Sequence, residues 1–229
     1  MPPIESIDSN QSDAIEVFKS LSASADEFEE YANPHATRIA AIADQLAKSF
    51  HLGARDRFSL RVAALAHDLG ETVMNRDYIR RPGALSDDER IDLARHPLLS
   101  EREAADSGAD RGAQLLVRWH HEWWNGNGYP DGLRFEQIPL GARILRVADA
   151  YASLTDARPF RKAYSEQQAR AHLLEWTGLE FDPRVVKSLL ALDPFKELKG
   201  YAQEPEPPPD LNVLADEIME RVQHLGEQV

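Results

Sequence analysis

The sequence contains no cysteine, which excludes disulfide bonds, thiolate nucleophiles and cysteine-ligated zinc sites. It also contains no apolar run close to the roughly 20 residues that a membrane-spanning helix needs. The first residues, MPPIESIDSNQSD, have neither a basic start nor an apolar stretch. We therefore expect no secretory signal, and a cytoplasmic location is the default expectation.

Positive charge is scarce, because 26 basic residues face 39 acidic ones and the net charge is −13. This balance opposes attraction to nucleic-acid backbones and to anionic membranes, so neither is expected as a partner. A small anionic substrate can still bind where metal ions or a few arginines create a local positive site. With 229 residues, of which 42% are hydrophobic, the chain is long enough for one domain with a buried core.

Apolar residues recur at helical spacing and no alternating strand pattern is present, so the predicted fold class is all-α. Asn33 and Pro34 predict the start of a helix that reaches about Phe50, with His35 in its first turn. Capping boxes at Ser86 and Ser165 predict two further helix starts. Further helices are expected over residues 57–68, 86–96, 112–122, 139–154, 165–176 and 182–192.

The domain organisation follows from composition. Residues 1–11 are expected to be disordered, and residues 12–200 to form one helical domain. The segment 201–210 contains EPEPPPD, which cannot continue a helix and predicts a stiff linker. Residues 211–229 carry an apolar stripe and predict a final helix that either folds back on the domain or pairs with a partner.

The histidines are unevenly placed. A single histidine is most often an ordinary core or surface residue, and His51, His172 and His224 are interpreted in that way. The others lie at predicted helix ends, in a first helical turn, or beside Asp68 or Glu122. This group of five comprises His35, His67, His96, His120 and His121.

Two aspartates strengthen the prediction of a metal site. Asp68 closes an apolar helix and Asp149 lies inside the apolar run ILRVADAYASL, and a buried carboxylate is costly unless it is paired or bound to a metal. Five imidazoles and two carboxylates exceed the needs of one ion, so we predict two divalent ions bridged by a carboxylate. Such ions polarise a phosphoryl oxygen and supply hydroxide at neutral pH, which is typical of phosphoester hydrolysis.

The ordered motifs complete the pattern. HATRIA, HDLG, ARHP, HHEWWNGNGYPDGL, IPLGARILRVADAYASLTDARPFRKA and GLEFDPRVV follow one another between residues 31 and 192. Together they closely resemble the HD-GYP family, the bacterial cyclic di-GMP phosphodiesterases of the HD hydrolase superfamily. The resemblance implies an HD-domain helical bundle extended by the HD-GYP C-terminal helices. It also implies hydrolysis of cyclic di-GMP, or a related cyclic dinucleotide, to linear pGpG or GMP by a metal-bridging hydroxide.

The resemblance also implies roles for individual residues. Tyr129, with Gly128 and Pro130, would shape the substrate pocket, and Arg158 and Arg161 would reach substrate phosphates. Iron or manganese is favoured over zinc, although mixed ligands admit all three. The first ion would be held by His35, His67, Asp68 and Asp149, and the second by Asp68, His96, His120 and His121.

Other residues near these motifs have more than one interpretation. Glu122 is expected to orient a ligand histidine, with an exposed helix end as the alternative. One of Trp123 and Trp124 is expected to stack on guanine and at least one to pack in the protein. The loop that contains Gly128, Tyr129 and Pro130 is called the GYP loop. This loop or the final helix is the candidate surface for a homodimer or a signalling protein.

Two positions depart from the family pattern. The usual HD-x-G-K motif ends here in Glu71, and a unit charge 4 Å from a phosphate is worth ~4 kcal/mol at an effective dielectric constant near 20. Asp68 and Glu71 are therefore the candidate catalytic positions. Members with three metals carry a glutamate where this chain has Tyr31, and Glu30 is one residue out of register, so a two-metal site is predicted.

Glu71 leaves two alternatives to the leading hypothesis. One is a catalytically weakened HD-GYP module that acts as a signalling or binding protein. The other is an HD hydrolase that acts on another nucleotide.

Overall fold

A computed structural model describes residues 4–157 and 162–192. The regular secondary structure of these residues is helical, apart from an isolated bridge between Thr177 and Phe181. The all-α prediction is confirmed. None of the described helices is long and apolar enough to cross a membrane. The α-helices are α1 (Ile4–Phe28), α2 (His35–Ser49), α3 (Ala54–Ala66), α4 (Leu69–Met74), α5 (Asp77–Arg80), α6 (Asp87–Leu93), α7 (His96–Asp106), α8 (Arg111–Arg118), α9 (Leu140–Thr155), α10 (Glu166–Glu175) and α11 (Pro183–Ala191).

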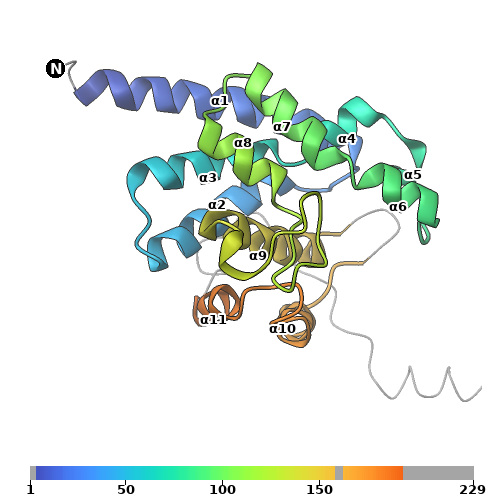
Figure 1. Ribbon diagram of the computed structural model, residues 1–229. Coiled ribbons are helices and arrows are strands. Elements are labelled where there is room, and N and C mark those ends of the chain that lie inside the picture. Colours follow the sequence, from blue (N-terminus) through green and yellow to red (C-terminus); the bar gives the residue numbers. More distant parts are fainter. Residues whose placement is uncertain (1–3, 158–161, 193–229) are drawn as a thin grey trace, which may run out of the picture.

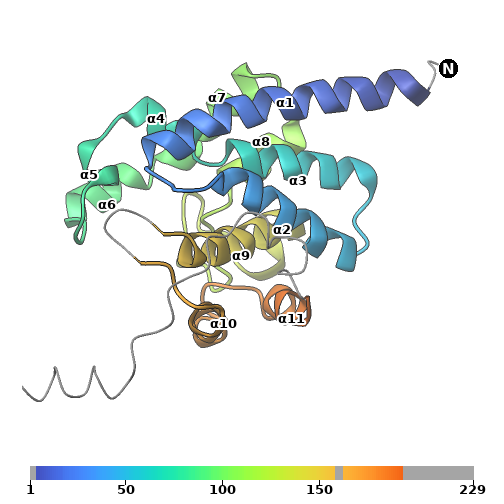
Figure 2. The same cartoon turned by 180° about the vertical axis from the view of Figure 1, so that it is seen from behind.

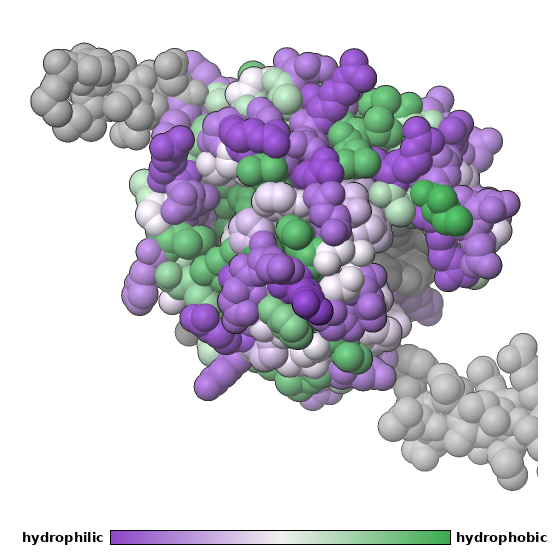
Figure 3. Space-filling view, viewed as in Figure 1, coloured by the Kyte–Doolittle hydropathy of each residue, from purple (hydrophilic) through white to green (hydrophobic). Residues whose placement is uncertain are grey.

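Helix α9 lies at the centre of the bundle, with α2 and α3 on one side and α10 and α11 on the other (Figures 1 and 2). Its run ILRVADAY is apolar on nearly every side, which is the pattern of a helix surrounded by protein. Ile144, Leu145 and Val147 are fully buried. Polar side chains cover most of the face seen in Figure 3, and the apolar ones there form small separate groups.

Helix starts coincide with capping residues. Ser86 and Ser165 form the two predicted capping boxes, and the Asp182 side chain accepts the Arg184 amide N–H at the start of α11. Asp110 caps α8 in the same way, by accepting the Ala113 amide N–H. These local bonds fix where α6, α8, α10 and α11 begin.

Two sequence-based boundaries are wrong. The sequence predicts disorder up to residue 11, but residues from Ile4 onwards belong to α1. The helix continues in the N-terminal direction beyond Ile15, the first of its residues that packs against the core. The helix after the Ser86 capping box ends at Leu93, and His96 begins a separate helix, α7. Pro97 explains this break, since proline has no amide hydrogen and cannot continue α6.

The short helices α4 and α5 carry no apolar repeat of their own and are absent from the sequence-based prediction. The predicted linker at 201–210 and the predicted helix at 211–229 lie outside the described residues.

Candidate metal centre

Helix ends deliver most of the candidate ligands to one place. His35 is the first residue of α2, and His67 and Asp68 join α3 to α4. His96 opens α7, and His120 and His121 follow α8. Asp149 comes from the middle of α9. All seven predicted ligands are therefore brought together, although their metal-binding role remains a prediction.

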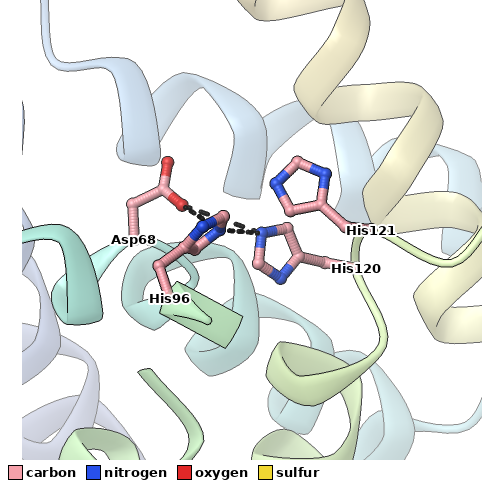
Figure 4. Close-up of side chains that lie close together, drawn as sticks. All are labelled: Asp68, His96, His120 and His121. Carbon is pink, nitrogen blue, oxygen red and sulfur yellow. Dashed lines mark hydrogen bonds and ion pairs between the residues drawn. The ribbon is translucent and has the colours of Figure 1, made fainter. Parts of the chain in front are cut away.

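Four of these residues form a first group, which we call group A: Asp68, His96, His120 and His121. One possible ligand atom from each lies within 4.8 Å of those of the others. The four side chains point toward one another (Figure 4). His96 Nε2 is 3.2 Å from His120 Nε2 and 3.3 Å from Asp68 Oδ1.

His35, His67 and Asp149 form group B, which satisfies the same 4.8 Å criterion. His35 Nε2 lies 3.8 Å from Asp149 Oδ1. Asp68 connects the two groups, because its Oδ2 lies 2.9 Å from His67 Nε2 while its Oδ1 faces His96 and His120. One carboxylate with an oxygen toward each group has the arrangement needed to bridge two ions.

Three of the imidazoles are oriented by backbone carbonyls in the last turns of helices. The Nδ1 atoms of His67, His96 and His120 donate to the carbonyls of Ala64, Leu93 and Val117, at 2.9, 2.8 and 2.6 Å. Each carbonyl lies three residues earlier, in the last turn of a helix, where carbonyls lack the usual helical partner. The carbonyl of Leu93 is available because Pro97 has no N–H to give it. Each ring therefore turns its Nε2 atom toward the centre.

His35 is oriented by a side chain instead. Its Nδ1 atom lies 2.9 Å from Asp156 Oδ2, and Arg38 forms an ion pair with the other oxygen of that buried carboxylate. Burial alone would lower the pKa of His35, but hydrogen bonds to Asp149 and Asp156 raise it. Asp156, at the C-terminal end of α9, lies inside a quoted motif but has no role assigned from the sequence.

The charges of the cluster suit a cation. Burial lowers the pKa of His67, but the neighbouring Asp68 outweighs burial and raises it to about 10. Burial likewise opposes ionisation of Asp68, yet His67 holds the pKa of this carboxyl well below its usual range. His67 Nε2 and Asp68 Oδ1 are buried, and the polar atoms nearest to them belong to the other candidate ligands. Inward-facing imidazoles and carboxylate oxygens of this kind fit divalent metal ions.

Glycine is required where the chain approaches these ligands most closely. A Cβ atom on Gly128 would lie 2.2 Å from the backbone nitrogen of Trp123 and 2.4 Å from the carbonyl oxygen of His121. A Cβ atom on Gly70 would lie 2.4 Å from the carbonyl oxygen of His96. Both glycines let backbone segments meet directly behind a candidate ligand.

Tyr129 lies beside the candidate ligand His121. Its amide donates to the carbonyl of His121, and its ring stacks on the His121 ring with 4.9 Å between centroids. A cis peptide bond joins it to Pro130. Tyr129 also borders a cavity of about 350 Å³ that opens beside both groups. Its position suits a role in the wall of a substrate pocket.

Glu122 is buried, so it is not at an exposed helix end. Its carboxylate accepts the Asp131 amide N–H at 2.7 Å and so holds the backbone of the GYP loop, while its orientation of a ligand histidine stays a prediction. Asp131 in turn accepts from Arg118 Nε at 2.6 Å and from Trp119 Nε1 at 2.7 Å. The loop is therefore fixed from both sides by α8 and the residues after it.

Both tryptophans of the motif pack against other aromatic rings. Trp123 contacts Trp176, and Trp124 contacts Phe135. Neither borders the cavity, so the expected stacking of one of them on guanine has no support from this arrangement.

The cavity wall contains residues that sequence reasoning missed. Glu71 is there as expected, buried, with Oε1 4.0 Å from His96 Nδ1. His172, interpreted from the sequence as ordinary, also borders the cavity. Arg146 is a further addition, and its one sequence signal is a charged residue inside the apolar run of α9. Glu29 and Glu180 are the remaining charged residues of the wall that sequence reasoning missed, whereas Arg158 and Arg161 lie outside the described residues.

Tyr31 occupies the position where three-metal members carry a glutamate. Its ring stacks on His35, with 3.8 Å between centroids. Glu30 points to solvent, whereas Glu29 is buried at the cavity wall.

Comparison with known proteins gives three kinds of match. A family model described as HD domain matches residues 19–185. The cyclic di-GMP phosphodiesterase response regulator RpfG of Xanthomonas campestris is 37% identical over 157 residues, which cover 67% of this chain and 41% of that protein. The 3'3'-cGAMP-specific phosphodiesterase 2 of Vibrio cholerae is 28% identical, over 68% of this chain and 30% of that protein.

Solved structures agree on the fold. A cyclic GMP-AMP phosphodiesterase of Vibrio cholerae superimposes with a TM-score of 0.61 at 17% identity, over 78% of this chain and 48% of that one. An HDG"Y"P protein of Bdellovibrio bacteriovorus gives 0.59 at 18% identity, over 82% and 63%. This chain spans less than half the length of both curated relatives described above.

Proposed function

Because this chain belongs to the HD domain family, we propose that it is a metal-dependent phosphodiesterase that hydrolyses cyclic dinucleotides, with cyclic di-GMP as the leading substrate. The match confirms the resemblance noted in the sequence. The observation that carries the proposal is the position of Asp68, with one oxygen toward each group of candidate ligands. Relatives named as phosphodiesterases of cyclic di-GMP and 3'3'-cGAMP support the substrate class.

In the proposed site, group A would hold one divalent ion. Group B, together with Asp68 of group A, would hold the other. When bound, the two ions supply Lewis acidity and hydroxide at neutral pH. The protein holds the rings of His35, His67, His96 and His120 by hydrogen bonds at Nδ1, which leaves their Nε2 atoms for metal binding. Tyr129 and the clamped loop close one side of the pocket and limit the poses in which a phosphodiester can bind.

The test supplies purified protein with Fe²⁺, Mn²⁺ or Zn²⁺ and follows cyclic di-GMP, 3'3'-cGAMP and other nucleotide phosphoesters by chromatography and mass spectrometry. We expect linear products from a cyclic dinucleotide, and loss of turnover in His67→Ala. His51→Asn is the matched control, because His51 is exposed and has a positive φ that asparagine tolerates. A preparation that contains two metals per chain but converts no cyclic dinucleotide would contradict the proposal.

A second candidate function is a binding module with weak turnover, and the position of Glu71 favours it. This carboxylate lies in the cavity wall near His96, where its charge opposes an incoming phosphate. If Glu71 suppresses hydrolysis, Glu71→Lys raises kcat/KM by tenfold or more, since each ~1.4 kcal/mol of barrier is a factor of ten. An unchanged rate in this variant would remove the reason for the second candidate.

A further inference from the structure

Arg146 is the one arginine or lysine that borders the cavity among the described residues. It lies one turn before Asp149 on α9, inside the otherwise apolar run. The cavity wall has many negative side chains by comparison. Its carboxylates are those of Glu29, Asp68, Glu71, Asp149 and Glu180.

The guanidinium of Arg146 is held in a fixed orientation. Nη1 donates to Asp149 Oδ2 at 3.0 Å, and Nη2 donates to the Glu180 carboxylate. Glu180 is itself fixed, because its carbonyl accepts the Trp124 amide N–H at 3.0 Å. Arginine has five N–H donors, so these two bonds leave others available, and Nε is buried with no hydrogen-bond partner.

The charge balance of the cavity makes this cation important. With the histidines neutral, five carboxylates and one guanidinium give the described wall a formal charge of −4, which two divalent ions would balance. A phosphodiester anion would then enter a wall in which, among the described residues, Arg146 is the fixed protein cation.

We propose that Arg146 donates to a phosphate oxygen of the bound substrate. Glu71 brings a negative charge to the cavity wall from the end of the HD motif, and Arg146 brings the positive charge from α9. The planar guanidinium suits a phosphate because it presents paired donors. The inference rests on the proposed function, since it concerns the same pocket and the same substrate class.

The test compares Arg146→Gln and Arg146→Lys with the wild type, all loaded with Mn²⁺ and checked for metal content by elemental analysis. Binding of inorganic phosphate is measured by calorimetry, and KM and kcat are measured with cyclic di-GMP. We expect Arg146→Gln to weaken phosphate binding and raise KM by about 10- to 100-fold at unchanged metal content, as for the loss of a charge-assisted hydrogen bond. Arg146→Lys should fall between the two, because it keeps the charge and loses the fork.

Arg143→Gln and Arg143→Lys are the matched controls. Arg143 lies one turn earlier on α9 and pairs with the buried carboxylate of Asp182 at 2.6 Å, but it does not border the cavity. Both controls should bind phosphate within about twofold of the wild type. A purely structural role for Arg146 would lower the metal content and leave phosphate affinity per loaded site unchanged, and that result would overturn the inference.

The two proposals fail in different ways. If the wild type binds phosphate through Arg146 but converts no cyclic dinucleotide, the proposed function is wrong and the assignment of Arg146 stands. If the wild type hydrolyses cyclic di-GMP and Arg146→Gln does so with the same KM, the assignment of Arg146 is wrong and the function stands.

Discussion

Single residues outside the ligand set determine how the ligands are presented. Asp156 binds the ring of His35 at Nδ1 and is itself paired with Arg38. The Nε2 atom of His35 therefore faces the other two members of group B. An imidazole without such a partner can rotate or bind through the wrong nitrogen. Partners of this kind typically contribute 10- to 100-fold to metal affinity.

We predict that Asp156→Asn weakens binding of one metal ion by roughly 10- to 100-fold and leaves the other nearly unchanged. Asparagine keeps the shape of the side chain but removes the charge that favours His35 as a ligand. Metal titration followed by elemental analysis measures both sites. Asp44→Asn is the control, because Asp44 pairs with Arg57 elsewhere on the protein. Equal weakening of both ions in Asp156→Asn would contradict this local role.

Among the helices, some boundaries can be predicted from the sequence and others cannot. Serine and aspartate caps predict the starts of α6, α10 and α11 because capping bonds span only two or three residues. The Asp110 cap of α8 is absent from the sequence-based prediction, which starts that helix at residue 112. Helices α4 and α5 have six and four residues, too few for an apolar repeat to be visible. The division of the ligands into two groups depends on how helix ends meet in space, so it follows from the family resemblance rather than from spacing.

Arg146 and Asp156 mark the limit of sequence reasoning about the site. Each is a charged residue on α9 or at its end, and although both lie within a quoted motif, the resemblance assigns a role to neither. Their significance arises from partners 34 and 121 residues away in sequence. Such partners are known only once the helices are packed.

The clamp on the GYP loop is testable at this scale. Arg118 joins Asp131 of the loop to Glu101 of α7, with ion pairs of 2.6 and 2.9 Å. We predict that Asp131→Ala releases the loop, increases hydrogen exchange over residues 125–133 and lowers kcat by up to roughly 100-fold through misplacement of Tyr129 and His121. Glu101→Gln is the control, since it breaks the other half of the Arg118 network. If hydrogen exchange over residues 125–133 is no faster in Asp131→Ala than in Glu101→Gln and the wild type, the loop does not depend on Asp131.

For the molecule as a whole, metal and protons compete for one centre. The pKa of His67 is raised to about 10 in the metal-free protein, so this residue carries a proton at pH 7 that a metal ion must displace. Metal affinity should therefore rise with pH, by up to about tenfold per unit for each displaced proton while the pH stays below 10.

Calorimetry of Mn²⁺ binding in buffers with different ionisation enthalpies, between pH 6.5 and 8.5, measures this proton release. We expect an apparent enthalpy that depends on the buffer and reports at least one proton released at pH 7. An enthalpy that is the same in every buffer, with an affinity independent of pH, would exclude a protonated His67 in the metal-free protein.

The free carbonyls at helix ends have a consequence for protein design. His67, His96 and His120 each follow their carbonyl partner by three residues, so four consecutive residues at a helix end determine which nitrogen faces inward. This hydrogen bond is local, so the same four-residue arrangement can be placed in another protein scaffold. A histidine three positions after a carbonyl in the last turn of a helix would be oriented through Nδ1, and a proline one residue later, as at Pro97, keeps that carbonyl available.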